Sequence, residues 1–280
     1  MGLSRERLQP WHHSGMPTSS QPTSQTPSHL SSVIARPLAQ AMVLAAGRGE
    51  RMRPLTDQTP KPLLPVRGQP LMLWPMQALA QGGFVQQLIN TAWLGEQIPA
   101  LLGDQARWPD LPKVHIRYSH EGQDFGRALE TAGGIVRALP QLDEAFWVVA
   151  GDVFAPDLVF TQPAVARFAA SAALAHLWLV PNPTHNLGGD FGLSATGQVL
   201  NLPKGSPGCA YTFSTVALYK QAFFADCGLP PGNPDGVALA LAPLLRAAMD
   251  RGQVSGEVYA GDWTDVGTPE RLAQLNGSNA

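Results

Sequence analysis

The 280-residue chain contains only two cysteines and no long apolar run. Neither Cys209 nor Cys227 belongs to a C-x-x-C or Cys/His pattern, which argues against a zinc or redox site. We interpret both as ordinary thiols in the reducing cytoplasm. No segment reaches the roughly 18 apolar residues of a membrane span, and residues 1–38 lack the apolar core of a secretory signal. We therefore expect no membrane partner.

Charge is also sparse. Charged residues make up 14% of the chain, and the formal net charge is −2. General nucleic-acid binding requires a basic face, so we expect no nucleic-acid partner. Hydrophobic residues make up 44%, which is enough for a sizeable core. The sequence leaves the oligomeric state open.

The first 38 residues are rich in Ser, Thr, Pro, Gln and His and contain little to bury. Such a composition cannot offset the entropy lost on ordering. We therefore expect a disordered tail over residues 1–38, followed by a single folded domain over residues 39–280.

Strand-like and helical patterns alternate from residue 40 onward. Strands are expected at 40–46, 88–93, 114–119, 146–152, 172–180, 191–195, 198–202, 211–219 and 255–260. Helices are expected at 71–81, 98–102, 132–139, 237–251 and from 268. This alternation predicts an α/β fold with a Rossmann-like, mixed but mostly parallel sheet flanked by helices. Ligands of such sheets bind at the carboxyl ends of the strands.

A glycine loop follows the first predicted strand, with Gly47 and Gly49 at its start. Glycines let backbone N–H groups approach an anion closely. Four cations surround the loop: Arg48, Arg51, Arg53 and Lys61. Arg48 and Arg53 could be solvated loop residues. The concentration of cations favours a ligand with several phosphates, such as a nucleoside triphosphate.

Two common phosphate-binding motifs do not fit this loop. The dinucleotide fingerprint requires a third glycine where Met52 stands. The P-loop requires G-K-[S/T], but Glu50 and Arg51 follow Gly49. The loop therefore matches neither of these two motifs.

Two aspartates are candidate metal ligands. Asp152 ends a very apolar strand, and Asp265 lies just before the last predicted helix. Each taken alone is more typical of a turn aspartate. Beside a triphosphate loop, however, a carboxylate pair suits Mg²⁺, which prefers one or two carboxylates together with phosphate oxygens and water.

The complete pattern, G-x-G-x-R-M-x-P-x-T followed by P-K-P-L-L-P, closely resembles the signature of the sugar-1-phosphate nucleotidylyltransferases. The resemblance implies that a sugar-1-phosphate oxygen attacks the α-phosphorus of a nucleoside triphosphate and displaces pyrophosphate. It implies that Asp152 and Asp265 hold Mg²⁺. Arg51 would then bind the β- and γ-phosphates, and Lys61 would lie near the α-phosphate. The further nucleotide-binding residues would be Ala46, Gly47, Gly49 and Glu50.

The segment from Leu129 to Pro140 resembles the base-recognition loop of the same family. The resemblance implies nucleotide contacts from Glu130, Thr131 and Gly133, together with Ala150 at the end of a strand. Thr131 is also expected to cap a helix N-terminus, which is compatible with that role.

Three further segments narrow the resemblance: residues 90–98, 181–193 and 255–272. They are similar to the uridylyltransferases that act on N-acetylmuramate 1-phosphate in bacterial cell-wall recycling. This implies UTP and N-acetylmuramate 1-phosphate as small-molecule substrates, with Asp190 and Glu257 as sugar contacts. From the residues alone, Asp190 could equally lie in a turn, and Glu257 could face solvent.

Two other functions remain open at this point. One is a nucleotidylyltransferase for glucose- or mannose-1-phosphate. The other is a non-catalytic nucleotide-sugar sensor, although such a protein should have lost some of the four key residues, all of which are present: Arg51, Lys61, Asp152 and Asp265. The acceptor-phosphate motif E-K-P of the family is absent, and Lys204 is a weak substitute.

Overall fold

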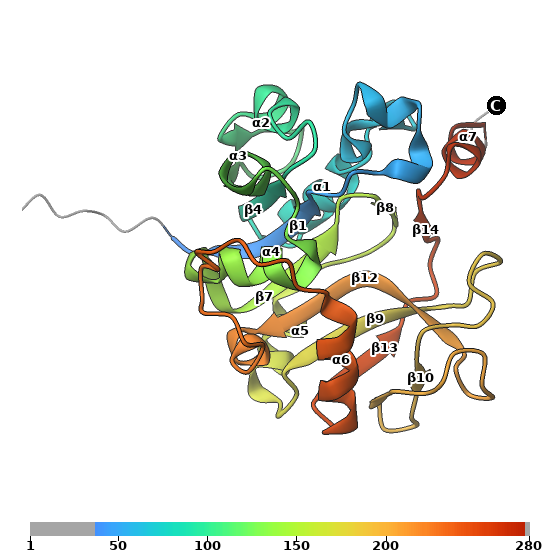
Figure 1. Cartoon of the computed structure of the whole chain (residues 1–280). Helices are drawn as coiled ribbons and strands as arrows, with labels where there is room; N and C mark the ends of the chain where they lie inside the picture. Colours follow the sequence, from blue (N-terminus) through green and yellow to red (C-terminus); the bar gives the residue numbers. More distant parts are fainter. Residues whose placement is uncertain (1–36, 278–280) are drawn as a thin grey trace, which may run out of the picture. The chain divides into compact units, whose positions relative to one another are not determined.

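An eight-stranded sheet forms the centre of this α/β protein (Figure 1). The fold is seen in a computed structural model that describes residues 37–277; most of the tail predicted over residues 1–38 lies outside them. The strand order is β13-β9-β12-β7-β1-β4-β6-β5. The strands are β1 (Ala39–Ala45), β4 (Gln86–Thr91), β5 (Gln105–Ala106), β6 (Val114–His120), β7 (Leu142–Ala150), β9 (Ala175–Pro181), β12 (Tyr211–Lys220) and β13 (Val254–Val258).

The sheet is mixed but mostly parallel, as predicted. Strand β1 pairs in parallel with β4 and β7, β4 pairs in parallel with β6, and β13 pairs in parallel with β9. Strand β12 runs antiparallel to both β7 and β9, and β5 runs antiparallel to β6. The central strands read as nearly continuous apolar runs because both of their faces are buried.

Helices cover both faces of the sheet. They are α1 (Leu73–Gln81), α2 (Gln97–Leu102), α3 (Glu121–Phe125), α4 (Glu130–Ala138), α5 (Gln162–Ala170), α6 (Leu241–Asp250) and α7 (Pro269–Gly277). Consecutive residues of β1 point to opposite faces: Met42 packs in the same cluster as α4 and α6, whereas Val43 packs with α1 and α5. Figure 1 shows α4 and α6 over one face.

Short elements lie in the loops at both edges of the sheet. Three two-stranded pieces form: β2 (Pro65–Val66) with β3 (Gln69–Pro70), β8 (Val153–Phe154) with β14 (Thr264–Asp265), and β10 (Gly192–Leu193) with β11 (Val199–Leu200). Five 3₁₀ turns are η1 (Glu50–Met52), η2 (Leu55–Asp57), η3 (Lys61–Leu63), η4 (Leu139–Gln141) and η5 (Gln221–Phe224). Over residues 37–277, no helix is long and apolar enough to cross a bilayer.

The structure corrects the prediction of a helix over 237–251. Helix α6 begins at Leu241, because the preceding segment is tied to α4 instead of continuing the helix. The N–H of Leu239 donates to the carbonyl of Leu129 at 3.0 Å, and its carbonyl accepts from Gly133 at 3.0 Å. Helix α5 was not predicted; its N-terminus is capped by the side chain of Thr161.

Candidate active site

The glycine loop begins where β1 ends, at the carboxyl edge of the sheet. Gly49 adopts a left-handed conformation with φ 65°, which favours glycine. A Cβ there would lie 3.0 Å from Cγ2 of Thr56 and 3.1 Å from Cβ of Lys61, so the loop closes tightly at this point. A Cβ at Gly47 would meet nothing within 4 Å. Gly47 therefore faces open space that a phosphate could occupy.

The loop arginines differ in their surroundings. The guanidinium of Arg48 donates to the carbonyl of Thr56 and to Asp57, both at 2.9 Å, and stacks 3.6 Å from the ring centre of Trp93. It therefore shapes the loop and is not a solvated cation. Arg53 pairs with Asp57 at 3.3 Å. Arg51 is exposed and forms no ion pair within residues 37–277, which leaves its charge available to a ligand.

Lys61 and Asp152 form the central ion pair. Lys61 lies on η3 and is only 9% exposed, and its Nζ atom is 2.5 Å from Oδ2 of Asp152. Asp152 follows the carboxyl end of β7, where the N–H of Gly151 donates to the carbonyl of Leu44 at 2.8 Å. The parallel pairing of β1 with β7 thus brings the phosphate loop and this carboxylate to one edge.

Asp265 lies beside Asp152 along the backbone. It pairs with Val153 in the β14–β8 ladder, and the N–H of Val266 donates to the carbonyl of Asp152 at 3.0 Å. Its side chain, however, does not line the cavity described below. It accepts from Arg271 and lies 2.9 Å from Nε2 of His185.

The two aspartates offer the hard oxygen ligands that Mg²⁺ prefers, and a metal ion would replace the cations that now pair with them, Lys61 at Asp152 and Arg271 at Asp265. No group of three or more His, Cys, Asp or Glu side chains gathers as a metal site in the part of the chain that the structure describes. A divalent ion held by Asp152 and Asp265 would therefore take its other ligands from phosphate oxygens and water.

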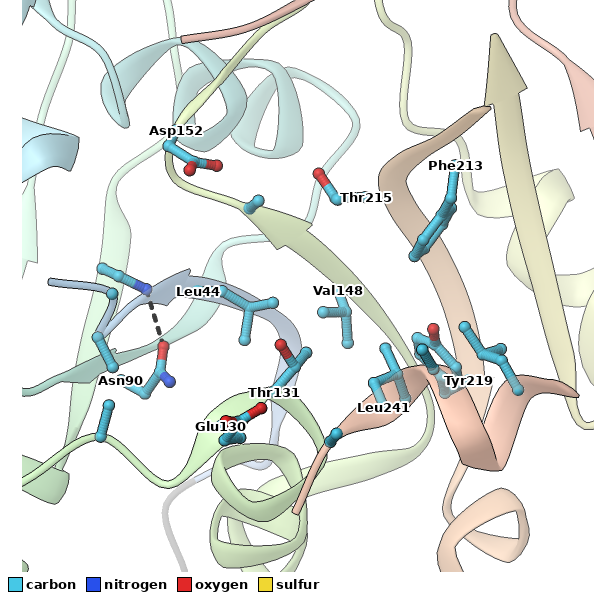
Figure 2. Close-up of a pocket in the computed structure, with 18 of the residues that line it drawn as sticks. Leu44, Asn90, Glu130, Thr131, Val148, Asp152, Phe213, Thr215, Tyr219 and Leu241 are labelled. Carbon is cyan, nitrogen blue, oxygen red and sulfur yellow. Dashed lines mark hydrogen bonds between the residues drawn. The ribbon is translucent and has the colours of Figure 1, made fainter. Parts of the chain in front are cut away.

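A cavity of about 610 Å³ opens next to Lys61 and Asp152 (Figure 2). Its apolar wall comes from β1, β7, β12 and α6 and includes Leu44, Val148, Phe213, Tyr219, Leu241 and Leu245. Its polar lining includes Lys61, Asn90, Glu121, Glu130, Thr131, Asp152, Asp190 and Arg246, and its backbone lining includes Ala46, Gly47 and Ala150. Gly49, Glu50, Arg51 and Gly133 do not line it.

The start of α4 forms one side of the cavity, and the structure corrects its cap. Thr131 lies inside the first turn and not at the N-cap, which is Leu129 and has no side-chain cap. The N–H of Leu129 instead donates to Oε2 of Glu121 at 2.7 Å. Gly133 serves packing, since a Cβ there would lie 2.7 Å from the carbonyl oxygen of Val237.

Asn90 and Glu121 join the phosphate loop to this helix, and the sequence analysis missed both. The backbone N–H of Ala45 donates to Oδ1 of Asn90 at 2.9 Å, and Nδ2 of Asn90 donates to Oε1 of Glu121 at 2.7 Å. Glu121 is fully buried, and burial raises the pKa of its carboxyl against the opposing hydrogen bonds from Leu129 and Asn90. A glutamate after a strand is too common to signal this role.

Asp190 and Arg246 lie together on the cavity wall. Asp190 accepts from the N–H of Phe213 at 3.0 Å and from Asn186 at 3.1 Å. Arg246, on α6, donates to Asn201 at 2.6 Å and to the carbonyl of Asp190 at 3.4 Å. The sequence analysis predicted Asp190 and missed Arg246, whose position in an amphipathic helix resembles that of an ordinary surface residue.

Glu257 lies elsewhere, which disagrees with its prediction as a sugar contact. It is on β13, and it shares a small separate pocket with Arg167, His176 and Ser255 beside α5. Nε2 of His176 is 3.6 Å from its carboxylate and lowers the pKa of Glu257. Strand alternation explains this position: Val254 packs in the cluster that contains α4 and α6, so Glu257, three residues further along β13, lies on the other face of the sheet.

Comparison with known proteins agrees with this arrangement. The family described as nucleotidyl transferase matches residues 40–279. A relative from Neisseria meningitidis, named N-acetylmuramate alpha-1-phosphate uridylyltransferase, is 46% identical over 84% of this chain and 96% of its own length. A relative of the same name from Caulobacter vibrioides is 31% identical over 82% of this chain and 92% of its own.

A solved structure from Bacillus anthracis, described as a glucose-1-phosphate thymidylyltransferase, has the same fold. It superposes with a TM-score of 0.69 at 22% identity, over 85% of this chain and 94% of its own. The family match covers nearly the whole described region, and the relatives match it over most of their length. The chain therefore belongs to the nucleotidyl transferase family.

Proposed function

We propose that this enzyme transfers UMP from UTP to N-acetylmuramate α-1-phosphate, giving UDP-N-acetylmuramate and pyrophosphate. The observation that carries the proposal is that one cavity is lined by the Lys61–Asp152 ion pair and also by the side chains of Asp190 and Arg246. The first suits a nucleotide phosphate, and the second suits a polar sugar that carries a negative charge. The two relatives with this name, which match the chain over most of their length, support the same substrates.

The reaction requires positioning and charge stabilisation and needs no general base. The phosphate of a sugar 1-phosphate is already a nucleophile, and its oxygen attacks the α-phosphorus in line with the departing pyrophosphate. Lys61 stabilises the charge that builds where the two substrates meet. The open backbone at Gly47 and the exposed guanidinium of Arg51 bind the triphosphate. Mg²⁺ held by Asp152 and Asp265 supplies further charge neutralisation when bound.

The choice of sugar rests on charge and hydrogen bonding. N-acetylmuramate carries a carboxylate that glucose and mannose lack, and Arg246 offers a guanidinium that suits it. Asp190 accepts hydrogen bonds from sugar hydroxyl or amide groups. The base of UTP lies toward Glu130 and Thr131 at the start of α4. We also propose a cytoplasmic location and a role in cell-wall recycling; both cysteines are free, as in a reducing compartment.

A matrix of pyrophosphate-release assays tests the proposal. UTP, TTP, GTP and ATP are each combined with N-acetylmuramate, glucose and mannose 1-phosphates. We expect the highest kcat/KM for UTP with N-acetylmuramate 1-phosphate, and a kcat/KM lower by a factor of about 10² or more for an Asp152→Asn variant. A faster reaction with glucose or mannose 1-phosphate would overturn the substrate and leave the reaction class intact. No release from any pair would favour a sensor.

A further inference from the structure

The hydroxyl of Tyr219 is buried without a partner. Tyr219 lies on β12 and is 0% exposed, with its ring packed among Phe146, Phe223 and Phe224. Its Oη atom has no hydrogen-bond partner within residues 37–277. Buried tyrosine hydroxyls nearly always find a partner, so an orphaned one needs an explanation.

The same side chain lines the candidate active-site cavity. Figure 2 shows Tyr219 beside Leu241, facing the space that Val148 and Phe213 also face. Four apolar residues line the same cavity and belong to, or pack against, the apolar cluster that contains Tyr219: Val148, Phe213, Leu241 and Leu245. We call this part of the cavity, lined by these four residues and Tyr219, the apolar recess. The hydroxyl of Tyr219 is the one hydrogen-bond donor at the bottom of this recess; it has no surface open to solvent, so a ligand reaches it only when the apolar side chains around it move.

The recess adjoins the region predicted to hold the sugar. The N–H of Phe213 donates to Oδ2 of Asp190 at 3.0 Å, and the same cavity is lined by Phe213, Tyr219 and Asp190. Across the recess, α6 carries Leu245 immediately before Arg246. A sugar held by Asp190 and Arg246 would therefore have the recess beside it.

The chemistry of the recess selects one kind of substituent. A charged group would lose its hydration and gain a single neutral donor, which is unfavourable. A sugar hydroxyl could accept the hydrogen bond, but it has no apolar group to pack against the apolar side chains of the recess. An acetamido group suits both parts, because its carbonyl accepts one hydrogen bond and its methyl group packs on apolar side chains. Burial raises the pKa of Tyr219, so its hydroxyl stays a donor at neutral pH.

We propose that Tyr219 is a specificity-determining residue whose hydroxyl donates to the N-acetyl carbonyl of the sugar 1-phosphate, with the acetyl methyl group against Leu241 and Leu245. This inference rests on the proposed function. It predicts that the enzyme discriminates against a sugar 1-phosphate whose amine is not acetylated.

The test compares N-acetylmuramate 1-phosphate with muramate 1-phosphate, the same sugar without its acetyl group. The wild type should prefer the acetylated substrate in kcat/KM. Tyr219→Phe should lower kcat/KM for the acetylated substrate by about tenfold, as expected for one lost hydrogen bond between uncharged groups. Its kcat/KM for the other substrate and its KM for UTP should be unchanged. Its melting temperature should not fall, because the variant removes only an unpartnered hydroxyl.

Tyr118→Phe is the matched control. Tyr118 lies on β6, and its hydroxyl donates to the carbonyl of Gly103 at 2.5 Å, away from the cavity. This change should lower the melting temperature and leave the preference for the acetylated sugar unchanged. If Tyr219→Phe keeps the wild-type preference, the inference is overturned. A wild type without that preference overturns it with no variant needed, whereas a wild type inactive on both substrates contradicts the proposed function instead.

Discussion

Nζ of Lys61 lies 2.5 Å from Oδ2 of Asp152, although the two residues are 91 positions apart in the chain. The pair joins the phosphate loop to the end of β7, and it sits on the wall of the main cavity. Each partner neutralises the other until a ligand arrives. A triphosphate with its metal ion offers Lys61 a phosphate and Asp152 a cation, so substrate binding can replace the pair without leaving a buried charge unpaired.

Asp152→Asn should lower kcat/KM by a factor of about 10² or more, which corresponds to roughly 3 kcal/mol of lost transition-state stabilisation. Asp265→Asn should have a similar effect through the same metal ion. Pyrophosphate release measured over a Mg²⁺ titration checks both. Asp124→Asn is the control, since Asp124 pairs with Arg137 and does not line the cavity. Full wild-type activity in excess EDTA would contradict the predicted dependence on Mg²⁺.

Two glycine substitutions should separate binding from stability. In Gly47→Ala the new methyl group meets no protein atom within 4 Å, so the melting temperature should hold while KM for UTP rises. In Gly134→Ala the Cβ would lie 2.5 Å from Oε1 of Glu121, so the free energy of unfolding should fall by about 1–3 kcal/mol. Urea unfolding and steady-state kinetics measure the two effects. A stable Gly134→Ala protein would show that Glu121 can move freely.

Asp190→Ala should lower kcat/KM for the sugar phosphate, and the loss should correspond to roughly 1.5–3 kcal/mol of transition-state stabilisation. The KM for UTP should be nearly unchanged. Glu257→Ala should leave both unchanged, because Glu257 lies in the separate pocket beside α5. Steady-state kinetics with each substrate varied in turn decides between them. Equal losses of kcat/KM for the sugar phosphate in the two variants would show that Glu257 does contact the sugar, and would contradict its assignment to the separate pocket.

Glu121 should make stability depend on pH. Its pKa is raised in the folded protein, so the folded state holds this proton more tightly than the unfolded chain. Its contribution to stability is therefore present below the ordinary glutamate pKa and is lost as pH rises through the raised pKa. Across that window the free energy of unfolding of the wild type should fall relative to that of Glu121→Gln. Urea unfolding at a series of pH values measures the difference between the two proteins.

The sequence predicted the sheet well because parallel strands buried on both faces leave long apolar runs. It also assigned Lys61 and Asp152 to one site, which the structure brings together at the edge where the carboxyl ends of neighbouring parallel strands meet; their direct ion pair was not predicted. It could not predict the exact start of α6, since residues 237–240 have helical composition but bond to α4 through Leu239. That choice depends on tertiary contacts.

The less predictable part of the site depends on which face a residue takes. Glu257 lies on β13, the edge strand of the sheet, and the sequence of that strand does not show which of its faces lies on the side of the cavity. Tyr219 and Arg246 look like core and surface residues in the sequence, and only the cavity between β12 and α6 brings them to one wall. Asn90 and Glu121 bind each other across 31 positions, which no local pattern encodes.

An internal competition tests the central claim most directly. The wild-type enzyme is given UTP with equal concentrations of N-acetylmuramate, glucose and mannose 1-phosphates, and the nucleotide sugars are separated and quantified at early times. The ratio of products equals the ratio of kcat/KM values. Our account predicts that UDP-N-acetylmuramate dominates the products. A mixture dominated by UDP-glucose or UDP-mannose would contradict it.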